Sequence, residues 1–148
     1  MNKSEDSFSY DIDAYTDGAA RGNPGPSAAA AVLMKGGQVV AERSIYLGHS
    51  TNNRAEYEGA LLALETAAEL GATSLRIHTD SELIARQVRG QYKVKNIDLM
   101  PLREKVVSLA AKLEKFAIVE IPRGKNSAAD GLANAALDAA LGLRPRRD

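Results

Sequence analysis

Hydrophobic and polar residues along this chain follow two patterns, one typical of strands and one typical of helices. Alternating or continuously apolar runs of strand length occur five times, at residues 10–16, 27–34, 38–47, 75–79 and 116–121. Apolar residues recur at helical spacing in four further stretches, at residues 54–70, 82–88, 101–113 and 127–141. The pattern therefore predicts strands and helices in these places.

The order of these elements predicts the sheet. Lys35-Gly36-Gly37 between the second and third strands has the residues of a turn, so the first three strands form an antiparallel meander. The fourth and fifth strands each follow a helical segment, and strands joined through helices run parallel. We therefore predict an α/β fold with a mixed five-stranded sheet, three antiparallel strands then two parallel, flanked by helices.

Composition is that of one globular domain. Hydrophobic residues make up 45% of the 148 residues and charged residues 26%. We assign residues 10–142 to a single domain, residues 1–9 to a flexible tail and residues 143–148 to a short basic tail. No apolar run reaches the roughly 18 residues of a membrane span, and the first residues lack a secretory signal. The sequence therefore predicts a cytoplasmic protein with no membrane contact.

Charge and cysteine content limit the kinds of binding site and catalytic group that the chain can contain. The 19 Lys and Arg residues balance the 19 Asp and Glu residues, so any surface for nucleic acid has to be local. The absence of cysteine excludes disulfides, thiolate zinc sites and a cysteine nucleophile. A metal site in this chain has to use oxygen or histidine ligands.

Four acidic residues occupy comparable places in the predicted fold. Asp17 and Asp80 lie at strand ends, whereas Glu56 and Asp130 lie in the first turns of helices. Each also has an ordinary structural explanation, since Asp17-Gly18 is a common turn dipeptide and Asp80 can cap a helix. Glu56 and Asp130 fit the spacing of capping boxes. Ligand crevices in such sheets form beyond the carboxyl ends of the strands, so all four side chains can also converge there.

Convergence of the four acids would have a chemical consequence. Neighbouring carboxylates repel one another, which raises the pKa of at least one unless a cation lies among them. Oxygen ligands without histidine or thiolate favour Mg²⁺, or Mn²⁺, over zinc. Such a cluster suits two-metal phosphoryl chemistry, in which one ion activates water and the other stabilises the leaving oxygen. The predicted substrate is a phosphodiester.

Four ordered segments resemble the cellular type 1 ribonuclease H family, over about residues 11–141. They read YTDGAARGNPGPS, TNNRAEYEGALLAL, HTDSELIARQ with YKVKN after it, and IPRGKNSAADGLANAALD. The resemblance implies a ribonuclease H-like sheet, and it implies that two Mg²⁺ ions, or Mn²⁺, are held by Asp17, Glu56, Asp80 and Asp130. The implied reaction is endonucleolytic hydrolysis of the RNA strand of an RNA/DNA hybrid, leaving 5′-phosphate and 3′-hydroxyl ends.

The resemblance also implies which residues meet the hybrid. The residues that line the RNA side of the groove would be Gly18, Ala19, Asn23, Asn52, Asn53 and Glu56. The 2′-hydroxyl groups on this side distinguish RNA from DNA. Phosphates of the DNA strand would contact Thr51 and Asn96, beside His49, where relatives often have an arginine. No obligate protein partner is evident.

Two segments depart from the better-known pattern of the family. Residues 89–99 are too short for the basic, tryptophan-rich protrusion of many relatives, and the chain contains no tryptophan. The loop before the last acid reads PRGKN, with Arg123 in place of a histidine, and so resembles a compact branch of the family. We therefore predict that Arg123 supports the reaction at a phosphate or at the leaving group.

Two other functions stay open on the sequence alone. The same fold serves nucleases with broader substrates, such as double-stranded RNA or DNA junctions. A non-catalytic nucleic-acid-binding module is the remaining reading. The intact set of four acids speaks against it, because such a module has no need of mutually repelling carboxylates.

Overall fold

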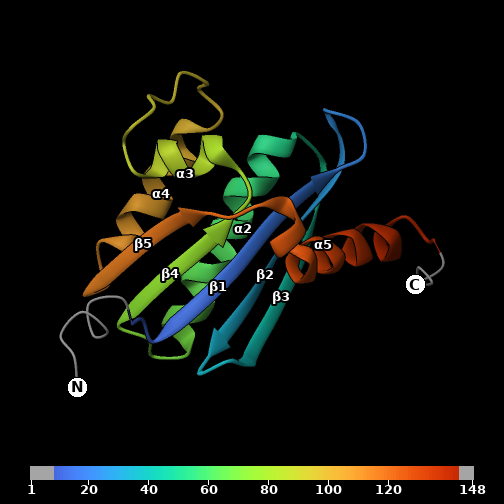
Figure 1. Cartoon of the computed structure of the whole chain (residues 1–148). Coiled ribbons are helices and arrows are strands. Elements are labelled where there is room, and N and C mark those ends of the chain that lie inside the picture. Colours follow the sequence, from blue (N-terminus) through green and yellow to red (C-terminus); the bar gives the residue numbers. More distant parts are fainter. Residues whose placement is uncertain (1–8, 144–148) are drawn as a thin grey trace.

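The computed structural model describes residues 9–143 and contains the predicted mixed sheet. The strands are β1 (Ile12–Ala20), β2 (Gly25–Lys35), β3 (Gln38–Ser50), β4 (Ser74–Thr79) and β5 (Lys115–Glu120). Their spatial order is β3-β2-β1-β4-β5, in which β1, β2 and β3 pair antiparallel while β1, β4 and β5 pair parallel (Figure 1). The predicted fold class is confirmed. Apart from Ser9 and Leu143, the two predicted tails lie outside the described residues.

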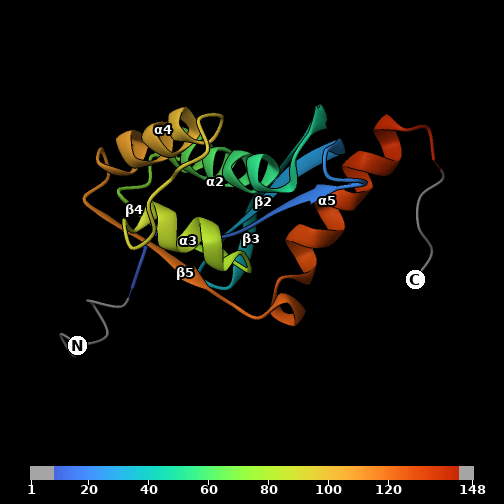
Figure 2. The ribbon, with the colours of Figure 1, turned by 90° about the horizontal axis from the view of Figure 1, so that it is seen from above.

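Helices cover both faces of this sheet. They are α2 (Asn52–Glu69), α3 (Glu82–Val88), α4 (Met100–Ala110) and α5 (Ser127–Ala140), with a 3₁₀ turn η1 (Arg123–Lys125) before α5. α2 packs on β1 and β2 and contacts α4, whereas α5 packs on β1, β2 and β3. Figure 2 shows α2 and α5 on opposite sides of the sheet. Within the described residues, no helix is both long and apolar enough to cross a membrane.

The period of two in β1 divides its side chains between the two faces of the sheet. Ile12 and Ala14 are buried in the hydrophobic core, which also contains the fully buried Tyr57 of α2. Asp13 and Tyr15 lie half-buried on the other face. The core therefore lies on the α2 side, and Asp13 and Tyr15 point away from it.

α2 approaches β1 closely because two positions at the contact are glycine. A Cβ atom at Gly18 would lie 2.4 Å from the main-chain carbon of Ala55, and one at Gly59 would lie 3.0 Å from the carbonyl oxygen of Asp17. A Cβ at 2.4 Å would force the two segments apart, because protein interiors are close-packed. Gly18 thus fixes the beginning of α2 beside the second half of β1.

β1 continues past the predicted end of the first strand at residue 16, so the alternative of a turn at Asp17-Gly18 is wrong. Asp17 pairs with Ala30 of β2, and the ladder continues to Ala20 and Ser27. The chain turns only at residues 21–24, where the Asn23-Pro24 peptide bond is cis. The tertiary pairing with β2 overrides the local turn propensity of the Asp-Gly dipeptide.

Two further boundaries differ from the prediction. β3 continues to Ser50 rather than ending at residue 47, and α2 begins at Asn52 rather than at residue 54. Thr51 is the N-cap of α2, since its hydroxyl oxygen accepts a hydrogen bond of 3.2 Å from the Arg54 N–H. Asn52 therefore lies in the first helical turn, where its position follows directly from the Thr51 cap.

Candidate active site

The sheet forks at Asp17. Parallel pairing between β1 and β4 ends at Thr16 and Thr79, while β1 continues beside β2 to Ala20. A crevice forms beyond the carboxyl end of β4, as expected where strand order and direction change in such sheets. Asp17 borders this crevice because the neighbouring strand ends there, although its own strand continues. The side chain is nevertheless buried.

Asp80 is the first residue after β4. The alternative in which Asp80 caps α3 is wrong, because Ser81 is the N-cap and its Oγ accepts a hydrogen bond of 3.2 Å from the Ile84 N–H. The Asp80 carboxylate instead accepts a hydrogen bond of 3.1 Å from Asn126 Nδ2 at its Oδ2 atom. Its carboxylate is therefore held by a side chain from the start of α5.

Glu56 reaches the same crevice from α2. It lies beyond the first turn of the helix, contrary to the prediction, and Thr51 rather than Asn53 is the cap, so no capping box forms. The Glu56 side chain is buried, and its Oε1 accepts a hydrogen bond from the Gly18 N–H. This bond joins α2 to β1 and fixes the direction of the carboxylate.

Asp17, Glu56 and Asp80 together form what we call the carboxylate cluster. Each offers an oxygen, and the three oxygens lie within 4.8 Å of one another. Burial, reinforced by neighbouring acids, raises the pKa of Asp17 to about 7. Burial and the Asp17 charge raise the pKa of Glu56 well above its ordinary value. Among the described residues, no Lys or Arg forms an ion pair with any of the three. Close, uncompensated oxygen ligands of this kind fit a divalent cation.

Asp130 lies beside the carboxylate cluster and not within it. It is exposed in the first turn of α5, as predicted, but Asn126 occupies the N-cap position, so Ser127 and Asp130 form no capping box. After burial, the nearby acids Asp80 and Asp130 add to the rise in the pKa of Asp17. The structure therefore brings all four predicted acids to one place, three of them in a compact group.

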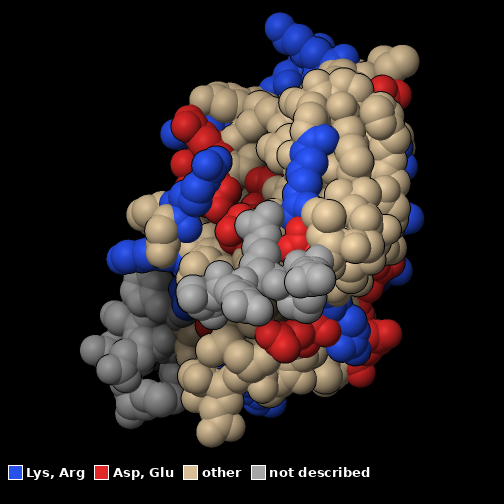
Figure 3. Space-filling model, turned by 90° about the vertical axis from the view of Figure 1, so that its right-hand side faces the viewer, with Lys and Arg blue, Asp and Glu red and all other residues tan. Residues whose placement is uncertain are grey.

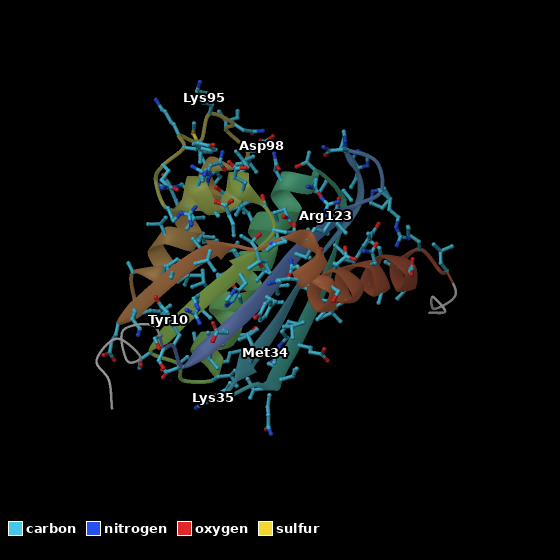
Figure 4. The ribbon with its side chains drawn as sticks, in the orientation of Figure 1. Tyr10, Met34, Lys35, Lys95, Asp98 and Arg123 are labelled. Atoms are coloured by element: carbon cyan, nitrogen blue, oxygen red, sulfur yellow. The ribbon has the colours of Figure 1, made fainter. Side chains whose placement is uncertain are left out.

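A cleft of about 460 Å³ surrounds the carboxylate cluster. Its lining residues are Asp17, Gly18, Ala19, Ala20, Asn52, Glu56, Asp80, Ser81, Glu82, Leu83, Arg123 and Asp130. Figure 3 shows acidic side chains in a hollow of the surface with basic side chains on both sides of it. Arg123, labelled in Figure 4 on the segment between β5 and α5, contributes a positive charge to the lining. The cleft thus combines a candidate cation site with a guanidinium group that can form a hydrogen bond to a phosphate.

The other predicted substrate-binding residues lie outside the lining of this cleft. They are Asn23, His49, Thr51, Asn53 and Asn96. Asn23 contacts a residue of the lining, because its Oδ1 accepts a hydrogen bond of 3.1 Å from the main-chain N–H of Asn52. The Asn96 Oδ1 accepts a hydrogen bond of 2.8 Å from the Asp98 N–H and so closes a local turn. His49 is exposed at the end of β3.

The chain is similar in sequence and fold to known proteins. A family model described as reverse transcriptase-like matches residues 15–136. Ribonuclease HI of Halobacterium salinarum is 42% identical over 128 residues, which cover 86% of this chain and 64% of that protein. Ribonuclease H of Methylococcus capsulatus is 33% identical over 147 residues, which cover 86% of this chain and 90% of that protein. The chain belongs to the ribonuclease H family.

A solved structure of the ribonuclease H family extends the comparison. LC11-RNase H1, in complex with an RNA/DNA hybrid, matches with a TM-score of 0.84 and 41% identity, covering 88% of this chain and 99% of that one. Enzymes of the family use divalent metal ions, in agreement with the carboxylate cluster. The chain spans 64% of the length of the halobacterial relative and 35% of the length of mycobacterial relatives.

Sequence reasoning missed several residues of the site. Ala20, Ser81, Glu82 and Leu83 line the cleft. Ala20 lies at the end of β1 and the other three directly follow Asp80, and these positions are the signal that would have found them. Asn126, which holds Asp80, gave no such signal. Its side-chain partners are remote in sequence, so only the folded chain reveals them.

Proposed function

We propose that this chain is an endoribonuclease that hydrolyses the RNA strand of RNA/DNA hybrids and leaves 5′-phosphate and 3′-hydroxyl ends. The observation that carries the proposal is the carboxylate cluster, in a cleft that also contains Asp130 and Arg123. A relative of 41% identity has been solved in complex with an RNA/DNA hybrid, which supports the same substrate class for this chain.

We assign two Mg²⁺ ions, with Mn²⁺ as the alternative, to the carboxylate cluster and Asp130. When bound, such ions supply a water molecule of lowered pKa and stabilise negative charge at the phosphodiester. The donor set supports this assignment because it consists of carboxylate oxygens, the ligands that Mg²⁺ prefers. The raised pKa values of Asp17 and Glu56 also mean that their ionised forms gain from a cation.

We assign residues that line the cleft to contacts with the RNA strand. The small side chains of Ala19 and Ala20 border the cleft and allow a sugar-phosphate backbone to come close to the main chain. Asn52, whose main-chain N–H is held by Asn23, is assigned to the 2′-hydroxyl, the group that distinguishes RNA from DNA. Arg123 is assigned to a phosphate oxygen, with which a guanidinium forms a charge-assisted hydrogen bond.

The DNA strand is assigned to a surface beside the cleft. Its predicted contacts are Thr51 and Asn96, with His49, and all three are exposed. Figure 4 shows Lys95 on the extended segment between α3 and α4, next to Asn96 in the chain. Because few basic residues are available there, we expect modest affinity for the hybrid. That binding should weaken as salt rises, since it depends on contacts between basic side chains and phosphates.

The test is cleavage of labelled RNA/DNA hybrid, RNA duplex and DNA duplex in Mg²⁺, Mn²⁺ or EDTA. We expect the RNA strand of the hybrid to be cut at internal positions with either ion, no cutting in EDTA, and products that a phosphatase shifts because they carry 5′-phosphates. Asp17→Asn should be inactive, and Asp13→Asn is the matched control on the same strand. A hybrid that survives both ions, or an Asp17→Asn variant as fast as the parent, would overturn the proposal. Equal cutting of RNA duplex would favour the broader nuclease.

A further inference from the structure

Asn126 is a polar residue in the interior at the start of α5. The residue is only 1% exposed, and it occupies the N-cap position of the helix. An asparagine in that position ordinarily uses its side-chain oxygen to accept a hydrogen bond from the first turn. Asn126 makes no such bond. Helix capping therefore does not explain the amide.

The Asn126 side chain points instead toward the sheet, where both of its amide hydrogens have acceptors. Nδ2 donates to the carbonyl oxygen of Thr16 at 2.9 Å and to Asp80 Oδ2 at 3.1 Å. The carbonyl oxygen Oδ1 is buried without a hydrogen-bond partner in the part of the chain that the structure describes. The fold thus tolerates an unpaired acceptor, which costs stability, while it satisfies both donors.

These contacts join three of the four segments that carry acids of the site. Thr16 precedes Asp17 on β1, and Asp80 directly follows β4. The main-chain carbonyl of Asn126 accepts a hydrogen bond of 3.1 Å from the Asp130 N–H. One residue therefore contacts β1, the end of β4 and the first turn of α5 at the fork where the carboxylate cluster lies.

We propose that Asn126 is a positioning residue, whose amide holds the Asp80 carboxylate in place for a divalent cation and sets α5 so that Asp130 reaches the same cleft. The proposal rests on the proposed function for its catalytic meaning, but the metal-binding part stands on the carboxylate cluster alone. Partners of this kind, one contact removed from the metal, commonly control ligand orientation and metal affinity.

The chemistry of the position favours an amide over other polar groups. A carboxylate in place of the amide would have no hydrogen to donate to the Thr16 carbonyl oxygen or to Asp80 Oδ2. It would also add a negative charge to the acidic site. A serine can donate only one hydrogen bond, so it can hold Thr16 or Asp80 but not both. Alanine removes both bonds. The three substitutions therefore form a graded series.

The experiment measures Mn²⁺ binding to the protein without nucleic acid, by calorimetry, for Asn126→Ala, Asn126→Ser and Asn126→Asp. We expect Asn126→Ala to weaken Mn²⁺ binding by about 10-fold to 100-fold, with Asn126→Ser in between the parent and Asn126→Ala. Asn126→Asp should lose cleavage most strongly. In hybrid cleavage, the Mg²⁺ concentration for half-maximal rate should rise and kcat should fall, while KM for the hybrid changes little.

The matched control is Tyr57→Phe, which removes another buried hydrogen bond, the one of 2.7 Å from the Tyr57 hydroxyl to Gln87 Oε1. It should lose stability without losing Mn²⁺ affinity. If the Asn126→Ala and Asn126→Ser variants are folded and bind Mn²⁺ as the parent does, the positioning role is wrong. If neither folds under conditions in which Tyr57→Phe does, Asn126 serves folding and the proposal is equally wrong.

The two proposals fail in different ways. A parent protein that binds Mn²⁺ but never cuts the hybrid would overturn the proposed function, while weaker Mn²⁺ binding by Asn126→Ala would still support the positioning role. A parent that cuts the hybrid, together with an Asn126→Ala variant of unchanged Mn²⁺ affinity and rate, would leave the function intact and remove the positioning role.

Discussion

Two aspartates on the same face of β1 have opposite surroundings. Asp13 meets donors, since Arg76 Nε and His78 Nε2 each lie 2.8 Å from its Oδ1. Asp17, four residues later, meets the carboxylates of Glu56 and Asp80. Burial by itself would raise the pKa of Asp13, but hydrogen bonds from His78 and Arg76 outweigh it, and the pKa lies below its ordinary value. Burial and acidic neighbours raise the pKa of Asp17 to about 7.

The difference in surroundings means that the Asp13 carboxylate stabilises the folded state, whereas the Asp17 carboxylate destabilises it. A carboxylate with two donors stabilises the native state in its charged form, whereas buried carboxylates that face one another destabilise it. Proteins keep such unfavourable groups where the charge is needed for binding or chemistry. Asp13 is therefore assigned to stability and Asp17 to the cation and substrate.

Exchanging each carboxylate for its amide gives the largest expected effect. Asp17→Asn should lower the rate of hybrid cleavage by about 1,000-fold or more. In a group of residues that act as one catalytic unit, the loss of a single member removes most of the rate enhancement of the whole group. It should also raise the melting temperature of the metal-free protein at pH 8, since one repelling charge is gone. Asp13→Asn should do the reverse and lose about 1–3 kcal/mol of stability while it keeps its cleavage rate. Cleavage assays and urea unfolding of both variants measure the contrast.

A result in which both variants lose stability and both keep activity would remove the distinction between the two aspartates. Circular dichroism of each variant at the assay temperature is the control, because it shows that a lost rate does not come from unfolded protein.

The second prediction concerns the packing that brings Glu56 to Asp17. Gly18→Ala places a Cβ 2.4 Å from the Ala55 main chain, and we expect it to cost about 3 kcal/mol or more. Cleavage should fall as well, because α2 carries Glu56. Gly131→Ala is the matched control in α5, where a Cβ meets nothing within 4 Å, and it should add about 0.5–1 kcal/mol. Equal stability of the two variants in urea unfolding would show that the contact between α2 and β1 can relax.

The third prediction follows the raised pKa of Asp17. In the metal-free folded protein this carboxyl stays protonated up to about pH 7, whereas in the unfolded chain it ionises near its ordinary value of 3.8. The folded state thus holds more protons between these values, so stability from this group falls as pH rises from about 4 to about 7. Asp17→Asn should flatten that slope in melting experiments at a series of pH values. Added Mg²⁺ should raise the melting temperature more at pH 8 than at pH 5.

Much of this contrast was predictable from local pattern, and part of it was not. The order of strands and helices placed Asp17, Glu56, Asp80 and Asp130 at one end of the sheet, because parallel strands bring their carboxyl ends together. The end of the first strand was predicted at residue 16 rather than at Ala20, since the turn propensity of Asp17-Gly18 cannot report the pairing of β1 with β2. The donors to Asp13 and the partners of the Asn126 side chain lie in segments remote in sequence, so the local sequence pattern could not predict these contacts.

The smallest expected effect comes from the donor side of Asp13. His78 lies 2.8 Å from Asp13 and stacks on Tyr15 with ring centroids 4.5 Å apart. His78→Val keeps a residue suited to a strand but removes the hydrogen bond and the stack, which should cost about 1 kcal/mol. The loss should be smaller than in Asp13→Asn, because Arg76 still donates to Asp13. Urea unfolding gives the stability, and hybrid cleavage should stay within about twofold of the parent rate. A folded His78→Val variant with strongly reduced cleavage would instead show that the face around Asp13 takes part in the reaction, and the division between the two aspartates would have to be redrawn.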